Sequence, residues 1–361
     1  MTFKSRKIVF LTNLPAPYRF PIWNRMAEKL DLTVFFTLGE NNWRNWPPPI
    51  DVKWNFRFLS LKCFRIKEYE FIPRFYGASQ ILKCTDLVII GSWDAPVYIS
   101  TLIQARLKSI PVVMIYESHE NSQRFRRGII SVIRSWCYRT ADLVVTFGEL
   151  STNAIEQMGV LPQNVTTLFN TVPMELYREV AKQRQIDWNI GHKYLFVGQL
   201  IERKNIESLL HAFDKIHLES DTLTIVGEGN RRKHLENIAL KMGLSNCVNF
   251  VGHKSSEELT QLYATHQTLV LPSINEVWGL VVNEALATGM HAVISSKCGV
   301  ANFVKNMKGC FISEPHEDDL ASAMERSRLD WSGFIETPEI LEYSPQKFTD
   351  LLVQKIVTSF S

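Results

Sequence analysis

Short apolar runs alternate with longer amphipathic segments along the whole chain. Segments such as 206–217 bring Leu209, Phe213 and Ile216 onto one face at helical spacing, which predicts an α-helix. Apolar runs separated by such helices are typical of parallel strands in a sheet that is covered on both sides. The predicted strands are 7–14, 32–38, 87–90, 112–117, 143–147, 165–169, 194–200, 223–226, 248–251, 269–271, 291–295 and 310–312.

This alternation stops once, between Val180 and His192, where the chain is polar and shows no period. We interpret the segment as a linker between two Rossmann-like, doubly wound α/β domains. The predicted domains are residues 1–185 and 190–335, and an amphipathic helix within 340–361 is expected to cross back to the first. Open α/β sheets bind ligands at the carboxyl ends of their strands, so we expect the main site in a cleft between the facing domains.

The composition excludes several classes of protein. Of the 361 residues, 45% are apolar and 21% are charged, which disfavours disorder. The net charge is only +3, but residues 1–190 carry 24 basic and 16 acidic side chains, which predicts an anionic partner there. The cysteines form no C-x-x-C pair, so neither a zinc site nor a disulfide framework is indicated. No apolar run approaches the roughly 18 residues of a spanning helix, so we expect a cytoplasmic protein, soluble or peripheral to the membrane.

A cationic turn, V-G-Q-L-I-E-R-K-N, follows the first strand of the second half. Gly198 lets the backbone turn, and Arg203 and Lys204 precede a predicted helix whose N-terminal N–H groups also attract anions. First helical turns normally favour acids, so two cations at this position indicate a diphosphate site more than solvated surface charges.

Glycines also follow the next two predicted strands. Gly227 and Gly229 follow one strand and Gly252 follows the other, so all three lie at one edge of the predicted sheet. Such turns allow a nucleotide to approach the backbone closely. Each alone is weak evidence, because a glycine pair also makes an ordinary tight turn.

Two glutamates lie eight residues apart in the stretch L-P-S-I-N-E-V-W-G-L-V-V-N-E-A-L-A-T-G. Glu276 falls in the loop after a strand, and Glu284 lies about two turns into a helix that we expect to begin near Trp278 or Gly279. Carboxylates accept pairs of hydrogen bonds from sugar hydroxyls. An unpaired acid in so apolar a helix would be costly, so we predict that both glutamates bind parts of one ligand.

Taken in order, these motifs resemble those of the retaining nucleotide-sugar transferases of glycosyltransferase family 4, which have the GT-B fold. The resemblance covers nearly all of residues 194–312. It implies that Arg203 and Lys204 neutralise the donor diphosphate, that Glu276 faces the donor-sugar hydroxyls and that Glu284 binds the ribose. The implied donor-binding residues are Gly198, Gln199, Gly227, Gly229, Gly252, His253, Val277, Trp278, Gly279, Leu280 and Glu284.

Two departures from the family pattern bear on the donor. Gln199 stands where many members have arginine, so neutralisation of the diphosphate rests more heavily on Arg203 and Lys204. The usual E-G-F-G is here E-V-W-G, and the bulkier Val277 leaves the identity of the donor sugar open.

The first half carries N-L-P-A-P-Y-R-F-P, which is similar to bacterial polysaccharide- and lipopolysaccharide-assembly members of the family. We predict Tyr18 and Arg19 as acceptor-binding residues. Arg19 either meets an anionic acceptor or pairs with a local acid. Relatives usually carry a histidine near Glu117 that contacts the transferring sugar, and either Glu117 or His119 takes this catalytic position.

A basic amphipathic segment follows in the first half. A membrane-surface helix and an ordinary helix whose apolar face packs on the sheet both fit its hydrophobic residues, and the arginines favour an anionic membrane. Its arginines are Arg124, Arg126, Arg127, Arg134 and Arg139, interleaved with Phe125, Ile129, Ile130, Ile133 and Trp136.

The resemblance implies glycosyl transfer from a UDP- or GDP-linked sugar to a hydroxyl of a glycan or lipid-linked glycan, with a donor phosphate oxygen as the base. No Asp-x-Asp pair follows a strand, so we expect no metal and no cofactor besides the nucleotide-sugar co-substrate. A nucleotide-sugar epimerase is the main alternative and would need no acceptor. A dehydrogenase lacks its G-x-G-x-x-G after the first strand, a lectin-like module would not need the two cations, and nucleic acid is not an expected partner.

Overall fold

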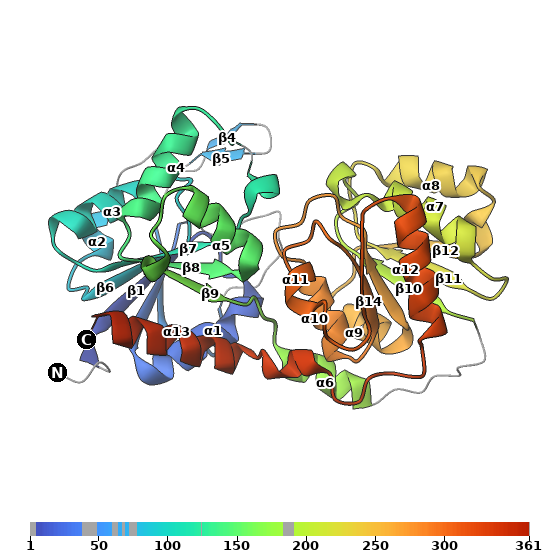
Figure 1. Ribbon diagram of the computed structural model, residues 1–361. Helices are drawn as coiled ribbons and strands as arrows, with labels where there is room; N and C mark the ends of the chain where they lie inside the picture. The colour runs from blue at the N-terminus through green and yellow to red at the C-terminus, as the bar shows by residue number, and fades with distance from the viewer. Residues whose placement is uncertain are drawn as a thin grey trace. The chain divides into compact units, whose positions relative to one another are not determined.

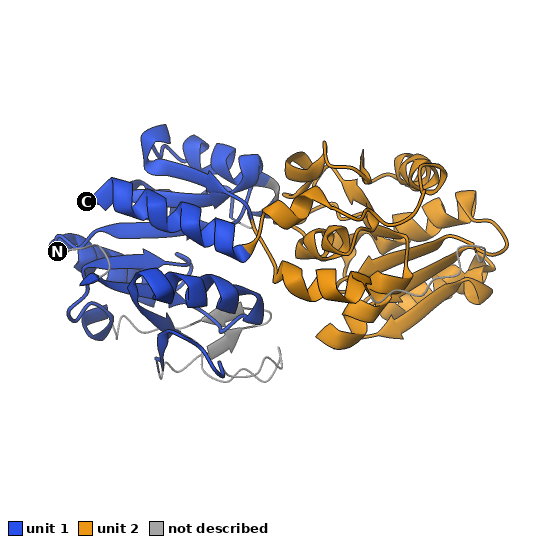
Figure 2. Ribbon diagram, turned by 90° about the horizontal axis from the view of Figure 1, so that it is seen from below, with its two compact units in different colours: residues 1–169, 345–361 blue, residues 170–344 orange. Residues whose placement is uncertain are grey.

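A computed structural model describes residues 5–37, 49–59, 64–66, 69–71, 78–123, 125–182 and 191–360. The chain divides into two compact units, residues 1–169 with 345–361, and residues 170–344 (Figure 2). This division falls earlier than the boundary expected near residue 185. The reason is that helix α6 (Met174–Lys182) packs on helices of the second unit, α9 (Ser256–Thr265) and α10 (Leu280–Ala287).

The first unit is built on a sheet whose described strands are all parallel, in the order β3-β2-β1-β6-β7-β8-β9. Strands β6, β7 and β8 are buried along their whole length, as their nearly continuous apolar sequences predict. The strands are β1 (Lys7–Thr12), β2 (Asp31–Phe36), β3 (Asn55–Phe58), β6 (Leu87–Ile90), β7 (Val112–Tyr116), β8 (Leu143–Phe147) and β9 (Val165–Leu168), with a separate antiparallel pair of β4 (Phe64–Ile66) and β5 (Tyr69–Phe71).

Helix α13 (Pro345–Phe360) belongs to this unit and lies beside α1 (Phe20–Lys29) (Figure 1). Its Phe348 ring stacks on Phe147, with 5.9 Å between ring centroids. Its Asp350 Oδ1 lies 3.1 Å from Arg25 Nε and 2.8 Å from Lys29 Nζ of α1. The other helices are α2 (Ala78–Ile81), α3 (Pro96–Leu107), α4 (Ile129–Thr140) and α5 (Gly148–Gln157).

Strand β3 was not expected from the sequence. Its four residues are exposed, and it forms the edge of the sheet by pairing with β2 alone among the described strands. So short a run lacks the continuous apolar character of the buried strands. The ring of Phe58 nevertheless packs 5.3 Å from that of Phe36, which fixes the strand on the sheet.

The second unit has a sheet whose described strands are again all parallel, in the order β12-β11-β10-β13-β14-β15. Its strands are β10 (Lys193–Val197), β11 (Thr222–Val226), β12 (Val248–Gly252), β13 (Thr268–Leu271), β14 (His291–Ser295) and β15 (Cys310–Ser313). Besides α6, α9 and α10, its helices are α7 (Ile206–Ile216), α8 (Arg232–Lys241), α11 (Ala301–Val304) and α12 (Glu317–Leu329).

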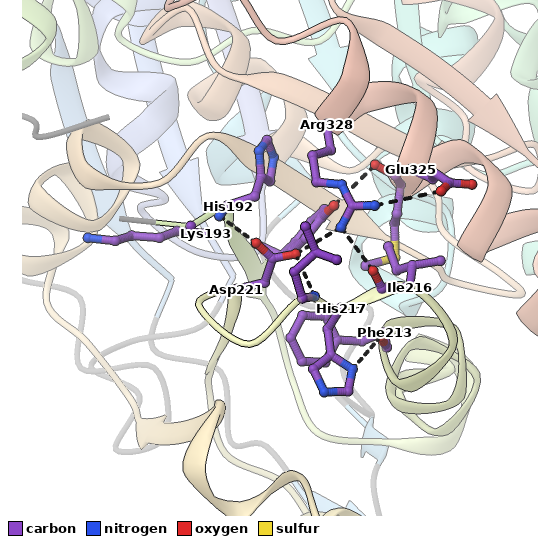
Figure 3. Close-up of polar contacts among 12 residues, drawn as sticks. His192, Lys193, Phe213, Ile216, His217, Asp221, Glu325 and Arg328 are labelled. Atoms are coloured by element: carbon purple, nitrogen blue, oxygen red, sulfur yellow. Dashed lines mark hydrogen bonds and ion pairs between the residues drawn. The ribbon is translucent and has the colours of Figure 1, made fainter. Parts of the chain in front are cut away.

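A buried ion pair fastens the amino-terminal edge of this sheet (Figure 3). Asp221 is 2% exposed and accepts hydrogen bonds from His192 N at 2.7 Å and from Arg328 Nη1 at 2.9 Å. The same Arg328 nitrogen donates to Ile216 O at 2.9 Å. These contacts join three segments: the start of β10, the loop before β11, and α12. The candidate site lies at the opposite edge of the sheet, where the strands end.

None of the helices in the described residues is long and apolar enough to cross a membrane.

Candidate active site

Three of the four charged side chains expected at the donor diphosphate and sugar converge in the second unit. Lys204 Nζ and Glu276 Oε2 form an ion pair, and Arg203 Nη1 lies 3.3 Å from the same carboxylate oxygen. The side chains of Lys204 and Glu276 are 10% and 13% exposed, whereas that of Arg203 is 42% exposed. Lys204 is therefore held inside the site and Arg203 reaches the surface.

The turn that carries the two cations is joined to neighbouring loops by its last residue. Asn205 has a left-handed backbone, with φ of 56°, and ends the short 3-10 turn Glu202–Lys204 before α7. Its Nδ2 donates to Pro272 O at 3.1 Å and to Pro315 O at 2.8 Å. Because these carbonyls follow β13 and β15, three strand ends are joined at one edge of the sheet.

The loop that carries Glu276 is fixed by close backbone contacts. Glu276 pairs with Cys298 in a parallel β-bridge, and Gly299 N donates to Glu276 O at 3.0 Å. A Cβ on Gly299 would collide with the carbonyl of Val277, so only glycine fits there. Gly279, with φ of 102°, then turns the chain into α10, slightly later than expected.

The remaining residues of the Glu276 loop divide into buried and accessible ones. Trp278 is 2% exposed, and its Nε1 donates to Asn283 Oδ1 at 2.8 Å. The flanking side chains of Val277 and Leu280 are partly exposed. Trp278 therefore supports the loop from inside, and the donor-binding roles of Val277 and Leu280 stay predictions.

The glycine turns have a structural reason that the sequence did not reveal. Gly227 has φ of 134°, and a Cβ there would collide with the carbonyl oxygen of Gly198. A Cβ on Gly229 would likewise collide with the backbone of Leu200. These glycines thus let the turn after β11 pack directly against the turn after β10. The donor-binding roles implied for them remain predictions.

The residues expected beside these turns are accessible. Gln199, the second residue after β10, is exposed, and so is His253, directly after β12. Gly252 is buried and has a left-handed φ of 73°. A Cβ on Gly252 would lie in close contact with the Glu228–Arg232 ion pair, 3.0 Å from Glu228 Oε1.

Glu284, the fourth expected side chain, lies with two tyrosines instead of joining the Arg203–Lys204–Glu276 cluster. Tyr263 OH donates to Glu284 Oε2 at 2.6 Å, and Tyr177 also hydrogen-bonds to this carboxylate. Burial raises the pKa of Glu284 above its ordinary value, while the two tyrosine hydroxyls lower it. The rings of Tyr177 and Tyr263 contact each other edge to face at 5.9 Å.

These two tyrosines are site residues that the sequence analysis missed. They come from α6 and α9, far from Glu284 along the chain, and no motif marks them.

The first unit places Tyr18, Arg19 and Glu117 around one pocket of about 410 Å³. Arg19 Nη2 and Glu117 Oε1 form an ion pair, so Arg19 does pair with a local acid. His119 is 2% exposed and does not line the pocket, and its backbone N–H donates to Ser122 Oγ at 2.8 Å. Of the two candidates for the catalytic position, Glu117 is the one that reaches a cavity.

Helix α4 buries Cys137 and Tyr138 but leaves its other large apolar residues exposed. Ile129, Val132, Ile133 and Trp136 are 77%, 63%, 37% and 39% exposed. An ordinary helix packing these residues on the sheet is therefore not what the structure shows. Arg134, expected among the surface arginines, is instead buried at 4% exposure. Arg124 lies outside the described residues.

Comparison with known proteins identifies this second unit. The model of the family "Glycosyl transferases group 1" matches residues 184–342. The second unit belongs to the group 1 glycosyl transferases. The chain is similar to part of an uncharacterized glycosyltransferase of Methanocaldococcus jannaschii, with 35% identity over 144 residues, 39% of this chain and 37% of that protein.

Further relatives extend the likeness. The lipopolysaccharide glucosyltransferase WaaG of Escherichia coli is 25% identical over 155 residues, 42% of this chain and 41% of WaaG. The crystal structure of HepE of Anabaena in complex with UDP superposes on this chain with a TM-score of 0.73 at 16% identity. The superposition covers 98% of this chain and 100% of HepE. That likeness shows that the fold of the whole chain is the two-domain GT-B fold. The chain spans about a third to a half of the first curated relatives it matches.

Proposed function

We propose that the chain transfers a sugar, with retention at the anomeric carbon, from a nucleoside diphosphate sugar to a hydroxyl of a glycan or lipid-linked glycan. The observation that carries the proposal is the meeting of Arg203, Lys204 and Glu276 at the carboxyl edge of the second sheet. This pairs cations suited to a diphosphate with a carboxylate suited to sugar hydroxyls.

The barrier in such a transfer is departure of the nucleoside diphosphate as negative charge grows on its oxygen. Preorganised donors at such an oxygen are each worth about 3 kcal/mol in comparable sites. In the structure the Glu276 carboxylate forms ion pairs with both Arg203 and Lys204. A bound diphosphate would compete for them and turn the carboxylate towards the sugar.

The solved structures support a nucleotide donor. The HepE crystals contain UDP, and others of the same protein contain UDP with glucose or UDP-glucose. We therefore propose a UDP-linked sugar as the first donor to test and a GDP-linked sugar as the second. The likeness to WaaG and to the galactosyltransferase WaaB, both named for lipopolysaccharide, supports a role in cell-surface polysaccharide biosynthesis.

A donor screen tests this function. A ligand that binds only the folded protein raises its melting temperature, so UDP-, GDP- and dTDP-sugars are compared by thermal shift. The selected donor is then supplied with a membrane glycolipid extract, and release of the nucleoside diphosphate is measured. We expect Lys204→Ala to lower turnover at least 100-fold, and Lys215→Ala, a surface lysine paired with Glu317, to leave it unchanged. No stabilising donor, or equal turnover in both variants, would refute the proposal.

We also propose that α4 binds the anionic inner surface of the cytoplasmic membrane. Residues 121–141 contain no Asp or Glu, and Arg127 and Arg139 are exposed near the apolar face. Exposed apolar side chains flanked by arginines fit a lipid interface, where each basic residue contributes about 1 kcal/mol with anionic lipid.

Vesicle sedimentation tests this membrane contact. Replacing Arg127 and Arg139 with Gln removes about 2 kcal/mol, so binding to phosphatidylglycerol vesicles should weaken about 30-fold. Ile129→Glu should abolish binding. Leu107→Glu alters an equally exposed leucine on α3 and should have no effect. Equal binding to neutral phosphatidylcholine vesicles, or equal loss in both Glu variants, would contradict the proposal.

A further inference from the structure

The pocket of the first unit lies where a sheet of this kind binds ligands. It opens at the carboxyl ends of β1, β6 and β7. Strands β1 and β6 are neighbours, but the chain leaves β1 towards β2 on its other side, so this is the switch point of the sheet. Its volume of about 410 Å³ falls within the range of about 300–1,000 Å³ found for small-molecule sites.

The charged groups on the pocket lining do not favour an anion. Among the lining residues in the described part of the chain, Arg19 is the cation, and it is already paired with Glu117. A second carboxylate, that of Asp94, is exposed and accepts a hydrogen bond from Ser92 Oγ at 2.6 Å. A phosphate or carboxylate entering here would have to displace Glu117 and approach Asp94.

Arg134 does not change this conclusion. It is buried, its Nη2 donates to Gln123 Oε1 at 2.7 Å, and its guanidinium lies 5.5 Å from the centre of the Trp93 ring. Trp93 lines the pocket and Arg134 does not. Its positive charge therefore lies behind Trp93, where it partly offsets the negative charge of the pocket carboxylates. Its guanidinium group would not contact a ligand in the pocket.

Resting on the glycosyl transfer proposed above, we propose that this pocket binds the ring of an uncharged, polyhydroxylated acceptor. Asp94 and Glu117 accept hydrogen bonds from its hydroxyls, and the hydroxyl of Ser92 adds a further polar contact. The partly buried ring of Trp93 provides apolar surface against the C–H groups of a sugar ring, whereas the guanidinium of Arg19 lies 5.7 Å from the centre of the Tyr18 ring. Of the two alternatives for Arg19, an anionic acceptor and a local acid, the structure shows the pair with the local acid Glu117.

Saturation-transfer NMR on the full chain tests the proposal with a matched pair of probes, methyl α-D-glucopyranoside and glucose 6-phosphate. We expect the glucoside to give the stronger signal and Asp94→Asn to weaken it at least five-fold. Asp31→Asn, at the opposite end of the sheet, should leave it unchanged. Glu117→Gln removes the partner of Arg19, so it should raise the signal of glucose 6-phosphate relative to that of the glucoside.

Three results would overturn the acceptor class. One is a stronger signal from glucose 6-phosphate than from the glucoside with the unaltered chain. Another is an equal effect of Asp94→Asn and Asp31→Asn on the glucoside signal. The third is no signal from any of the methyl glycosides of glucose, galactose and mannose. Failure of the proposed transfer is distinguishable, because Lys204→Ala acts on the second unit and should leave the glucoside signal intact. A signal that disappears in Lys204→Ala would place the glucoside in the donor site and also overturn the proposal.

Discussion

Replacing Tyr263 with Phe tests the role of the tyrosines around Glu284. The Tyr263 hydroxyl donates to the Glu284 carboxylate at 2.6 Å, and its ring is fully buried. Phe keeps the ring and its edge-to-face contact with Tyr177, so the fold should survive. The change therefore removes one hydrogen bond to a carboxylate whose pKa burial already raises.

The size of the effect follows from the strength of that bond. A hydrogen bond to a charged group contributes about 1.5–3 kcal/mol, which corresponds to roughly 10- to 100-fold in the balance between ionised and neutral Glu284. Without it the pKa of Glu284 rises further, so more of the carboxyl is protonated at a given pH. A protonated carboxyl accepts fewer hydrogen bonds from ribose hydroxyls, and nucleotide binding should weaken.

Isothermal calorimetry with the nucleotide selected by the donor screen, at pH 6, 7, 8 and 9, measures this directly. Because the bond lost from Glu284 stabilises its ionised form, we expect Tyr263→Phe to bind more weakly at the acid end of this range and to approach the unaltered protein as pH rises. Tyr194→Phe is the matched control, because its buried hydroxyl donates to Met324 O at 3.2 Å, away from Glu284. A loss in Tyr263→Phe that is the same at every pH, or no loss, would refute this reasoning.

Three further predictions concern stability and metal dependence. Burial lowers the pKa of His192 and His266 to about 4, so the stability that each contributes is complete above about pH 6.5 and falls as pH drops towards 4. Denaturant unfolding at pH 7 and pH 4.5 should show that the free energy of unfolding falls by up to ~3 kcal/mol for each histidine. His266→Gln should reduce this difference, and an equal free energy of unfolding at the two pH values would contradict the prediction. Gly227→Ala should destabilise the protein by more than about 3 kcal/mol, because the new Cβ would collide with the carbonyl oxygen of Gly198. Gly243→Ala should cost about 1 kcal/mol, because no atom lies within 4 Å of the new Cβ. Similar losses of stability for the two variants in thermal unfolding would contradict this prediction. Turnover should persist in EDTA because Arg203 and Lys204 supply the positive charge, and loss of activity that Mg²⁺ restores would overturn this.

The buried framework could be predicted from the sequence because strands such as β7 and β8 are apolar on both faces. The convergence of Lys204 and Glu276 could also be anticipated, since both follow strands that end at one sheet edge. The edge strand β3 could not, because its short, exposed sequence carries too little apolar signal.

Features that depend on packing between distant segments were also beyond the sequence. The helical period of α4 is the same whether its apolar face points inward or outward, so neither the exposure of Trp136 nor the burial of Arg134 could be derived. Glu117 and His119 are two residues apart just past the end of β7, and only the path of the chain there decides which of them reaches the pocket.

In the proposed reaction, Arg203 and Lys204 hold the diphosphate of the donor. Calorimetry with the nucleoside and the nucleoside diphosphate of the same base, on the unaltered chain and on Lys204→Ala, tests this role. We expect Lys204→Ala to weaken binding of the diphosphate about 100-fold, close to 3 kcal/mol, and to leave nucleoside binding nearly unchanged. Equal losses for both ligands, or no loss for the diphosphate, would contradict it.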